Sequence, residues 1–173
     1  MENFDGMEEN SMEREARPSF LTVLCILSFI SIGLGILSGL IGLAFGPMSE
    51  EAMLQQKTEW AKMADELRSL GSEGFAVMME QFERMLDGLN KNHYANSAIS
   101  VLIRMVGFLG VFWMWKGKKN GFHLYIIFSL LALVQMYFFV SPADIPTIMV
   151  IWNVSISALF VFLYARNLKW LTA

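Results

Sequence analysis

Residues 20–45 contain no charged side chain, and this run constrains the fold more than any other feature of the sequence. At about 1.5 Å per residue, a helix over the run is longer than the ~30 Å hydrocarbon core of a bilayer, so it must tilt or extend beyond the lipid. A cleaved signal peptide would have a basic start and an apolar stretch of only about 7–15 residues. This run is longer and follows an acidic segment. We therefore expect a transmembrane helix over residues 19–46.

Three more apolar blocks follow, over residues 94–115, 122–140 and 145–165. Charged residues make up 17% of the chain, against about 25% in a typical soluble domain, and they are concentrated between the blocks. The sequence thus predicts an all-α membrane protein with four transmembrane helices. Short polar turns at 116–121 and 141–144 join the second span to the third and the third span to the fourth.

The one long charged connection, residues 47–93, has the pattern of an amphipathic helical hairpin. Apolar residues recur at helical spacing on both sides of the break Gly71-Ser72-Glu73-Gly74, which predicts two amphipathic helices joined by a short turn. The apolar stripes could pack on each other and on the membrane surface. Alternatively, because methionine side chains adapt to varied partners, they could form a docking surface. The residues of that surface would be Trp60, Met63, Phe75, Met78, Met79 and Phe82.

Lysine and arginine in short loops predict which ends of the spans face the cytoplasm. Basic residues precede the first span, fill the turn at 116–121 and follow the last span, whereas the turn at 141–144 has none. We therefore expect a disordered cytoplasmic tail over 1–18, a short cytoplasmic tail over 166–173, and an extracytoplasmic hairpin. The hairpin's five basic residues argue against this orientation, although nine carboxylates outnumber them.

Arg104 is the one charged residue within a predicted span, where a charge costs roughly 2.5–3.5 kcal/mol on insertion scales. Three interpretations are open. The side chain could extend toward an interface or bond to Gln135, Asn153 and backbone carbonyls. It could pair with a carboxylate of a partner subunit, or it could bind an anionic lipid or small anion. Gln135 and Asn153 are the other candidate polar residues, and their ordinary role is hydrogen bonding between helices.

Small residues recur every four positions along the first span. They form two ridges, each with a GxxxG match, and such ridges let helix backbones approach closely. Two ridges on one helix suggest packing on two sides, and one of those sides could meet another chain. The ridge residues are Ser31, Gly35 and Gly39 in one ridge and Ser38, Gly42 and Gly46 in the other.

The sequence offers little for catalysis or metal binding. His93 and His123 belong to opposite membrane faces in this topology, and no HExxH, GxSxG or glycine-rich phosphate loop is present. One cysteine, Cys25, excludes an intrachain disulfide and a multi-cysteine metal site. We therefore predict no enzymatic activity, no cofactor and no metal. The absence of a basic tract likewise predicts no nucleic-acid binding.

The segment from Arg17-Pro18-Ser19-Phe20 through Ser28-Phe29-Ile30, with the glycine-rich run after it, resembles the opening of small multi-pass proteins of Bacteroidota that have no assigned function. This resemblance covers about a sixth of the chain. It implies a bacterial inner-membrane location and brings no activity or site residues with it.

These features favour a non-enzymatic accessory or scaffold subunit of a larger inner-membrane complex. The small size, the unpaired Arg104, the glycine ridges and the methionine-rich hairpin all point to contacts with membrane lipids and other subunits or a second copy. The alternative is a small transporter, channel or lipid-binding protein with an anionic site at Arg104. That alternative predicts a polar cavity around Arg104, Gln135 and Asn153.

Overall fold

The structure is a computed structural model that describes residues 17–171, and it is all α-helical over that range. Four of its helices are long and apolar enough to cross a membrane, which confirms the predicted fold class. No β-strand occurs among the described residues. The predicted disordered tail lies almost entirely outside this range, because the description begins at Arg17.

The four spans follow the predicted boundaries closely, with one local difference. The helices are α1 (Ser19–Phe45), α4 (His93–Trp115), α5 (Asn120–Val134) and α6 (Thr147–Ala165). The third span does not stay α-helical to its end, because α5 gives way to the 3₁₀ helix η1 (Gln135–Phe138). A second 3₁₀ turn, η2 (Pro142–Asp144), leads to Pro146 and the start of α6.

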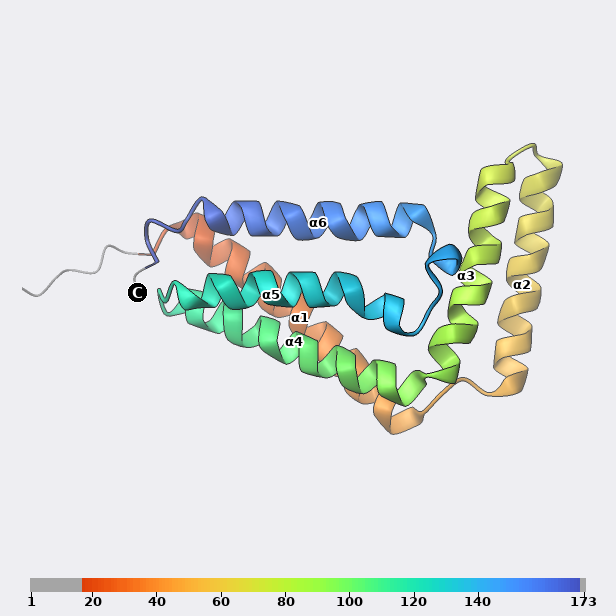
Figure 1. Cartoon of the computed structure of the whole chain (residues 1–173), viewed down its shortest axis with the longest axis horizontal. Coiled ribbons are helices and arrows are strands. Elements are labelled where there is room, and N and C mark those ends of the chain that lie inside the picture. Colours follow the sequence, from red (N-terminus) through yellow and green to blue (C-terminus); the bar gives the residue numbers. More distant parts are fainter. Residues whose placement is uncertain (1–16, 172–173) are drawn as a thin grey trace, which may run out of the picture.

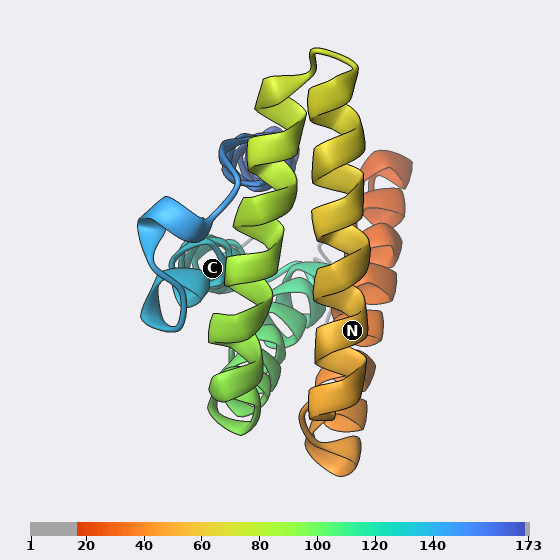
Figure 2. The ribbon, with the colours of Figure 1, turned by 90° about the vertical axis from the view of Figure 1, so that its right-hand side faces the viewer.

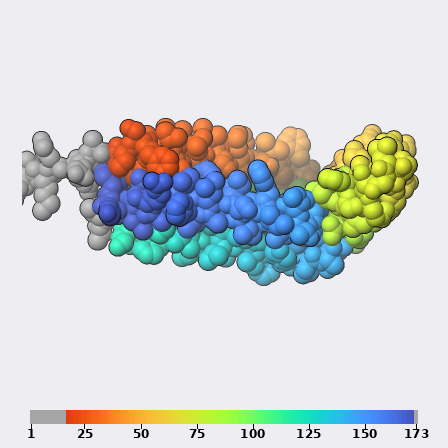
Figure 3. Space-filling model, turned by 90° about the horizontal axis from the view of Figure 1, so that it is seen from above, coloured from red at the N-terminus to blue at the C-terminus, as the bar shows by residue number. Residues whose placement is uncertain are grey.

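The bundle has two ends, which Figure 1 shows at the left and the right. At the terminal end, α1 begins, α4 passes into α5, and α6 finishes. At the hairpin end, α1 finishes, α4 begins, and η1 and η2 connect α5 to α6. Helix α6 lies on the outside of the bundle, with α1 along one side of it and α5 along the other (Figure 3).

A seam of glycines on α1 brings this helix close to α4. A Cβ added at Gly35 would collide with the guanidinium of Arg104, and one at Gly39 would lie 2.5 Å from Val101 Cγ2. Farther along the helix, Gly42 faces Ser97 and His93, and Gly46 faces Tyr94. The glycines of both predicted ridges therefore join one contact with α4, instead of dividing between two sides of α1. Their spacing of four, three and four residues keeps them on a single helix face. Ser31 and Ser38 of those ridges are exposed.

The main apolar core lies at the terminal end. Five side chains from α1, α4 and α6 are fully buried there: Leu21, Cys25, Val111, Met114 and Tyr164. The Tyr164 hydroxyl donates a hydrogen bond of 2.8 Å to Ser28 Oγ and so ties α6 to α1. Arg17 lies over the ring of Trp115 at 3.8 Å and donates to the Trp115 carbonyl, which fixes the start of α1.

The predicted hairpin is present as α2 (Glu50–Ser69) and α3 (Glu73–Lys91), which lie across the hairpin end of the bundle (Figures 1 and 2). The Ser49 side chain caps α2 by accepting from the Ala52 amide. Helix α3 is attached to η2, because Arg84 Nε donates to Asp144 Oδ1 at 2.6 Å and Gln81 donates to the Ala143 carbonyl. Three buried side chains form a small apolar cluster beneath this attachment: Met85, Val140 and Ile145.

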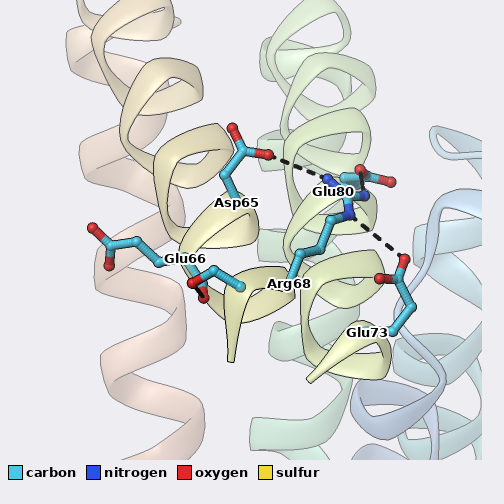
Figure 4. A network of polar contacts seen from close by, with 6 residues as sticks. Asp65, Glu66, Arg68, Glu73 and Glu80 are labelled. Atoms are coloured by element: carbon cyan, nitrogen blue, oxygen red, sulfur yellow. Dashed lines mark hydrogen bonds and ion pairs between the residues drawn. The ribbon is translucent and has the colours of Figure 1, made fainter. Parts of the chain in front are cut away.

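Ion pairs hold the two hairpin helices together along their length. Near the turn, Arg68 of α2 contacts Glu80, Glu73 and Asp65 (Figure 4). The hydrogen bond from Arg68 lowers the pKa of the Glu80 carboxyl below its ordinary value of 4.5, with the charge of Arg68 acting in the same direction. At the base of the hairpin, Lys57 Nζ lies 2.6 Å from Asp87 Oδ2.

Candidate functional site

A cavity of about 410 Å³ lies between α4, the α5–η1 segment and α6 in the half of the bundle nearest the hairpin. Its volume falls within the usual range of small-molecule sites, about 300–1,000 Å³. Three helices contribute polar side chains to its wall: Asn96, Ser100 and Arg104 from α4, Gln135 from η1, and Asn153 from α6. The three residues singled out from the sequence, Arg104, Gln135 and Asn153, thus line one space.

Arg104 is half-buried and points back along its own helix. Side chains of an α-helix tilt toward its N-terminus, and here the Arg104 Nη1 donates to Ser100 Oγ at 2.9 Å, one turn closer to the hairpin. The same Nη1 donates to the Gly35 carbonyl at 3.2 Å. At about 1.5 Å per residue, Ser100 lies only about 10 Å from the hairpin end of α4. The charge is therefore displaced from the middle of the span toward that end.

The guanidinium retains hydrogen-bonding capacity beyond these two contacts. It has five N–H groups, and both of its bonds start from Nη1. Within residues 17–171, neither Nε nor Nη2 donates to an acceptor, and no carboxylate lies within ion-pair distance of the group. No Asp or Glu occurs in any of the four spans, and no described residue of the cavity wall neutralises this charge.

Gln135 forms another part of the cavity wall. Its Nε2 donates to both the carbonyl and the side-chain oxygen of Asn96, at 3.2 and 2.9 Å, and so bridges η1 to α4. The bridge starts where the third span changes from α to 3₁₀ geometry, as is common at the C-terminus of a helix. The Gln135 side-chain oxygen accepts no hydrogen bond from the described residues.

A second cavity, about 330 Å³ in volume, meets the first at Arg104. The two share Leu89, Asn96, Ser100 and Arg104 as lining residues. The second cavity extends along the glycine seam of α1 toward His93, whose Nε2 lies 2.8 Å from the Gly42 carbonyl. Polar side chains therefore follow α4 continuously from the base of the hairpin to Arg104.

Helix α6 leaves the first cavity open on one side. Every residue from Ile151 to Ile156 is exposed, and six consecutive residues at about 100° each surround the helix completely. The helix is held instead near its two ends, by the buried Tyr164 at one and by Pro146 beside the Ile145 cluster at the other. Asn153 lies within the exposed stretch, and its amide donates only to the Met149 carbonyl.

The predicted docking surface of the hairpin is not a single exposed patch. Trp60 and Phe82 pack on each other across the two helices, with ring centroids 6.1 Å apart. Met78 and Met79 are partly buried, whereas Met63 and Phe75 are 47% and 61% exposed. The stripe is thus divided between packing within the hairpin and exposure.

Asn96 and Ser100 are site residues that sequence reasoning missed. Both precede Arg104 at four-residue steps, so all three share one face of α4, and that spacing is the signal that could have found them. Over residues 17–171, no three His, Cys, Asp or Glu side chains are arranged to hold a metal ion.

No protein-family model matches the chain, and neither a curated protein nor a solved structure is significantly similar to it, so function must be argued from the cavity itself.

Proposed function

We propose that this protein binds an anionic amphiphile of the membrane, with the charged headgroup at Arg104 and the apolar chain along α6. One observation carries the proposal. Arg104 lines a cavity of about 410 Å³ and has unused N–H groups but no carboxylate partner among the described residues. An uncompensated charge in lipid is costly, and an anion in the cavity would offset that cost.

The distribution of side chains around the cavity supports an amphiphile over a small soluble anion. The polar groups belong mainly to α4 and η1, whereas α5 and α6 contribute an apolar wall. The exposed stretch of α6 from Ile151 to Ile156 opens the same space toward the lipid. An acyl chain could occupy this side while its headgroup remains at Arg104. The apolar wall consists of Ala132, Leu133, Val134, Met149, Val150 and Val154.

The accessory-subunit hypothesis is the second candidate, and the exposed stretch of α6 favours it as well. A transmembrane helix of a partner could pack in the gap between α6 and the bundle and direct a carboxylate toward Arg104. Such a partner would bury the side chains that α6 exposes on all sides. Both candidates use Arg104 for binding, and neither assigns it a catalytic step.

We further propose a bacterial inner-membrane location with both termini in the cytoplasm. The support is the distribution of charge, because Lys and Arg at the terminal end would lie in the cytoplasm under the positive-inside rule. These residues are Arg17, Lys116, Lys118, Lys119, Arg166 and Lys169. In this orientation, Arg104 and both cavities belong to the extracytoplasmic half of the membrane.

The test is to purify the tagged protein from native membranes in mild detergent and to identify by mass spectrometry what remains bound. We expect stoichiometric anionic lipid on the unmodified protein and on Arg104→Lys, and its loss from Arg104→Gln. The control is Lys62→Gln, which removes an exposed cation of the hairpin outside both cavities. A stoichiometric protein partner that depends on Arg104, without bound lipid, would instead establish the second candidate.

A further inference from the structure

We infer that the amphiphile bound at Arg104 is a lipid with a singly charged phosphodiester and a neutral polyol headgroup, as in phosphatidylglycerol, and that aminated headgroups are rejected. This inference rests on the proposed function and narrows it to one class of ligand. It follows from which hydrogen-bonding groups the cavity offers and which charges it lacks.

The charge of the site suits a monoanion. Among the described residues, Arg104 is the only Lys, Arg, Asp or Glu in the wall of either cavity. One guanidinium neutralises one phosphodiester, and its planar edge suits bidentate contact with two phosphate oxygens. The N–H groups of Nε and Nη2, which have no acceptor among the described residues, are available for this contact.

An ammonium group would find no counter-ion in the same space. The wall of both cavities contains no Asp or Glu, and an ammonium would lie close to the positive charge of Arg104. Two carboxylates near the hairpin end of the bundle are already paired. Asp144 accepts from Arg84 at 2.6 Å, and Asp87 accepts from Lys57 at 2.6 Å. A zwitterionic lipid would therefore bury an unpaired cation, which is strongly unfavourable.

Neutral polar groups around Arg104 match hydroxyl and ester oxygens. The Asn96 amide nitrogen donates no hydrogen bond within the described residues, and the Gln135 side-chain oxygen accepts none. Asn153 adds a carbonyl oxygen and a further N–H from the opposite side of the cavity. A simple carboxylate would use Arg104 and leave these groups without partners. A glycerol headgroup supplies donors and acceptors to each of them.

The experiment titrates delipidated full-length protein in detergent with lipids of equal chain length and reads bound lipid by native mass spectrometry. We expect phosphatidylglycerol to bind at least about tenfold more tightly than phosphatidylethanolamine, because like charges placed together cost several kcal/mol. Arg104→Gln should reduce the affinity for phosphatidylglycerol to that for phosphatidylethanolamine. Deacylated phosphatidylglycerol, the soluble phosphodiester, should compete only weakly. Equal competition by it would overturn the assignment to a lipid.

A charge substitution in the cavity wall provides the sharper test. Asn153→Asp places a carboxylate in the wall of the cavity that Arg104 lines and should lower the ratio of phosphatidylglycerol to phosphatidylethanolamine affinity by about tenfold, since it gives an ammonium its partner and repels a phosphate. The matched control is Ser155→Asp, which adds the same charge to the exposed stretch of α6 but outside the cavity wall, and should keep the original preference.

The outcomes separate the inference from the proposed function. Similar affinities for both lipids that still depend on Arg104 would overturn the inference and leave the proposed function standing. Oleate that displaces phosphatidylglycerol at equal concentration would do the same, because it would replace the phosphodiester with a carboxylate. Binding of every lipid that is unaffected by Arg104→Gln would overturn both.

Discussion

The two halves of the transmembrane bundle are built on opposite principles. At the terminal end, side chains from α1, α4 and α6 are fully buried, and a hydroxyl pair, Tyr164 and Ser28, closes the contact between α6 and α1. At the hairpin end, two cavities meet around a half-buried arginine, and the stretch of α6 from Ile151 to Ile156 is exposed. A chain of 173 residues thus concentrates its close packing in one half and leaves space in the other.

Glycines show how the same residue type serves both halves differently. At the terminal end, Gly110 and Gly121 allow the backbones of α4 and α5 to touch: a Cβ at Gly121 would lie 2.5 Å from both Gly110 O and Met114 N. At the hairpin end, the space at Gly35 is occupied by the side chain of Arg104 instead of a helix backbone. Close approach in one half brings two helix backbones together, and in the other it accommodates the side chain of Arg104.

The largest expected change in the free energy of unfolding comes from Gly121→Val, a substitution in the closely packed terminal end. The added side chain must displace backbone atoms of α4, which cannot yield as a flexible side chain would. We expect a loss of about 3 kcal/mol or more in the free energy of unfolding, measured by denaturation in mixed detergent micelles.

The control for this variant is Gly33→Ala on α1, because an added Cβ there meets no atom within 4 Å. Its stability should equal or slightly exceed that of the unmodified protein, since alanine favours the helix by up to about 1 kcal/mol. If Gly121→Val were as stable as the unmodified protein, the terminal end would not be the more closely packed half of the bundle.

The spans and the hairpin were predictable from the sequence because each depends on local pattern. Uncharged length defines α1 and α6, and helical spacing of apolar residues defines α2 and α3. The change to 3₁₀ geometry at Gln135 was not predictable, because the residues on both sides of Gln135 are apolar and continue the pattern of a span. The exposure of α6 on all sides was also not predictable from the sequence, since it depends on which helices pack together.

Within the site, the sequence pointed to Arg104, Gln135 and Asn153, and it left hydrogen bonds among them and a shared polar cavity as open alternatives. Their meeting depends on the approach of three helices, and hydropathy carries no information about that approach. Asn96 and Ser100 differ, because their spacing from Arg104 places them on its face of α4 by local geometry alone.

The second largest effect is expected at the hairpin end, where a substitution should raise the free energy of unfolding instead of lowering it. Arg104→Leu removes a half-buried charge that no described carboxylate compensates. We expect the lipid-free protein to gain about 2 kcal/mol in the free energy of unfolding, measured in neutral detergent, since insertion scales assign such a charge a cost of roughly 2.5–3.5 kcal/mol. The same variant should lose bound anionic lipid. A loss of stability comparable to that of Gly121→Val would show that Arg104 supports the fold.

A smaller effect concerns the attachment of α6 at the terminal end. Tyr164→Phe removes the hydrogen bond to Ser28 and leaves the ring packing intact, so a cost of about 1 kcal/mol is expected. Ser28→Ala should cost a similar amount, and the double variant should cost less than the sum of the two, as shown by a double-mutant cycle in the same unfolding assay. Additive costs would mean that the hydroxyl pair does not link the two helices.

The smallest expected effect is a pH-dependent loss of hydrogen-exchange protection in the hairpin. It tests whether order near the hairpin turn affects the hairpin end of the bundle. Arg68 lowers the pKa of Glu80, so the ion pair stabilises the folded hairpin above the carboxyl's ordinary pKa of 4.5, and this contribution is lost as the pH falls through the lowered value. Amides of residues 66–80 should lose hydrogen-exchange protection over that range, after correction for intrinsic rates. Arg68→Gln should remove this pH dependence, whereas Lys62→Gln, whose lysine has no ion pair among the described residues, should retain it.

Because the pair of Arg68 and Glu80 lies near the hairpin turn, hydrogen-exchange protection along α4 between Asn96 and Arg104 should stay constant. Parallel loss of protection there would mean that the cavities depend on the far end of the hairpin as well as on its attachment at Asp144.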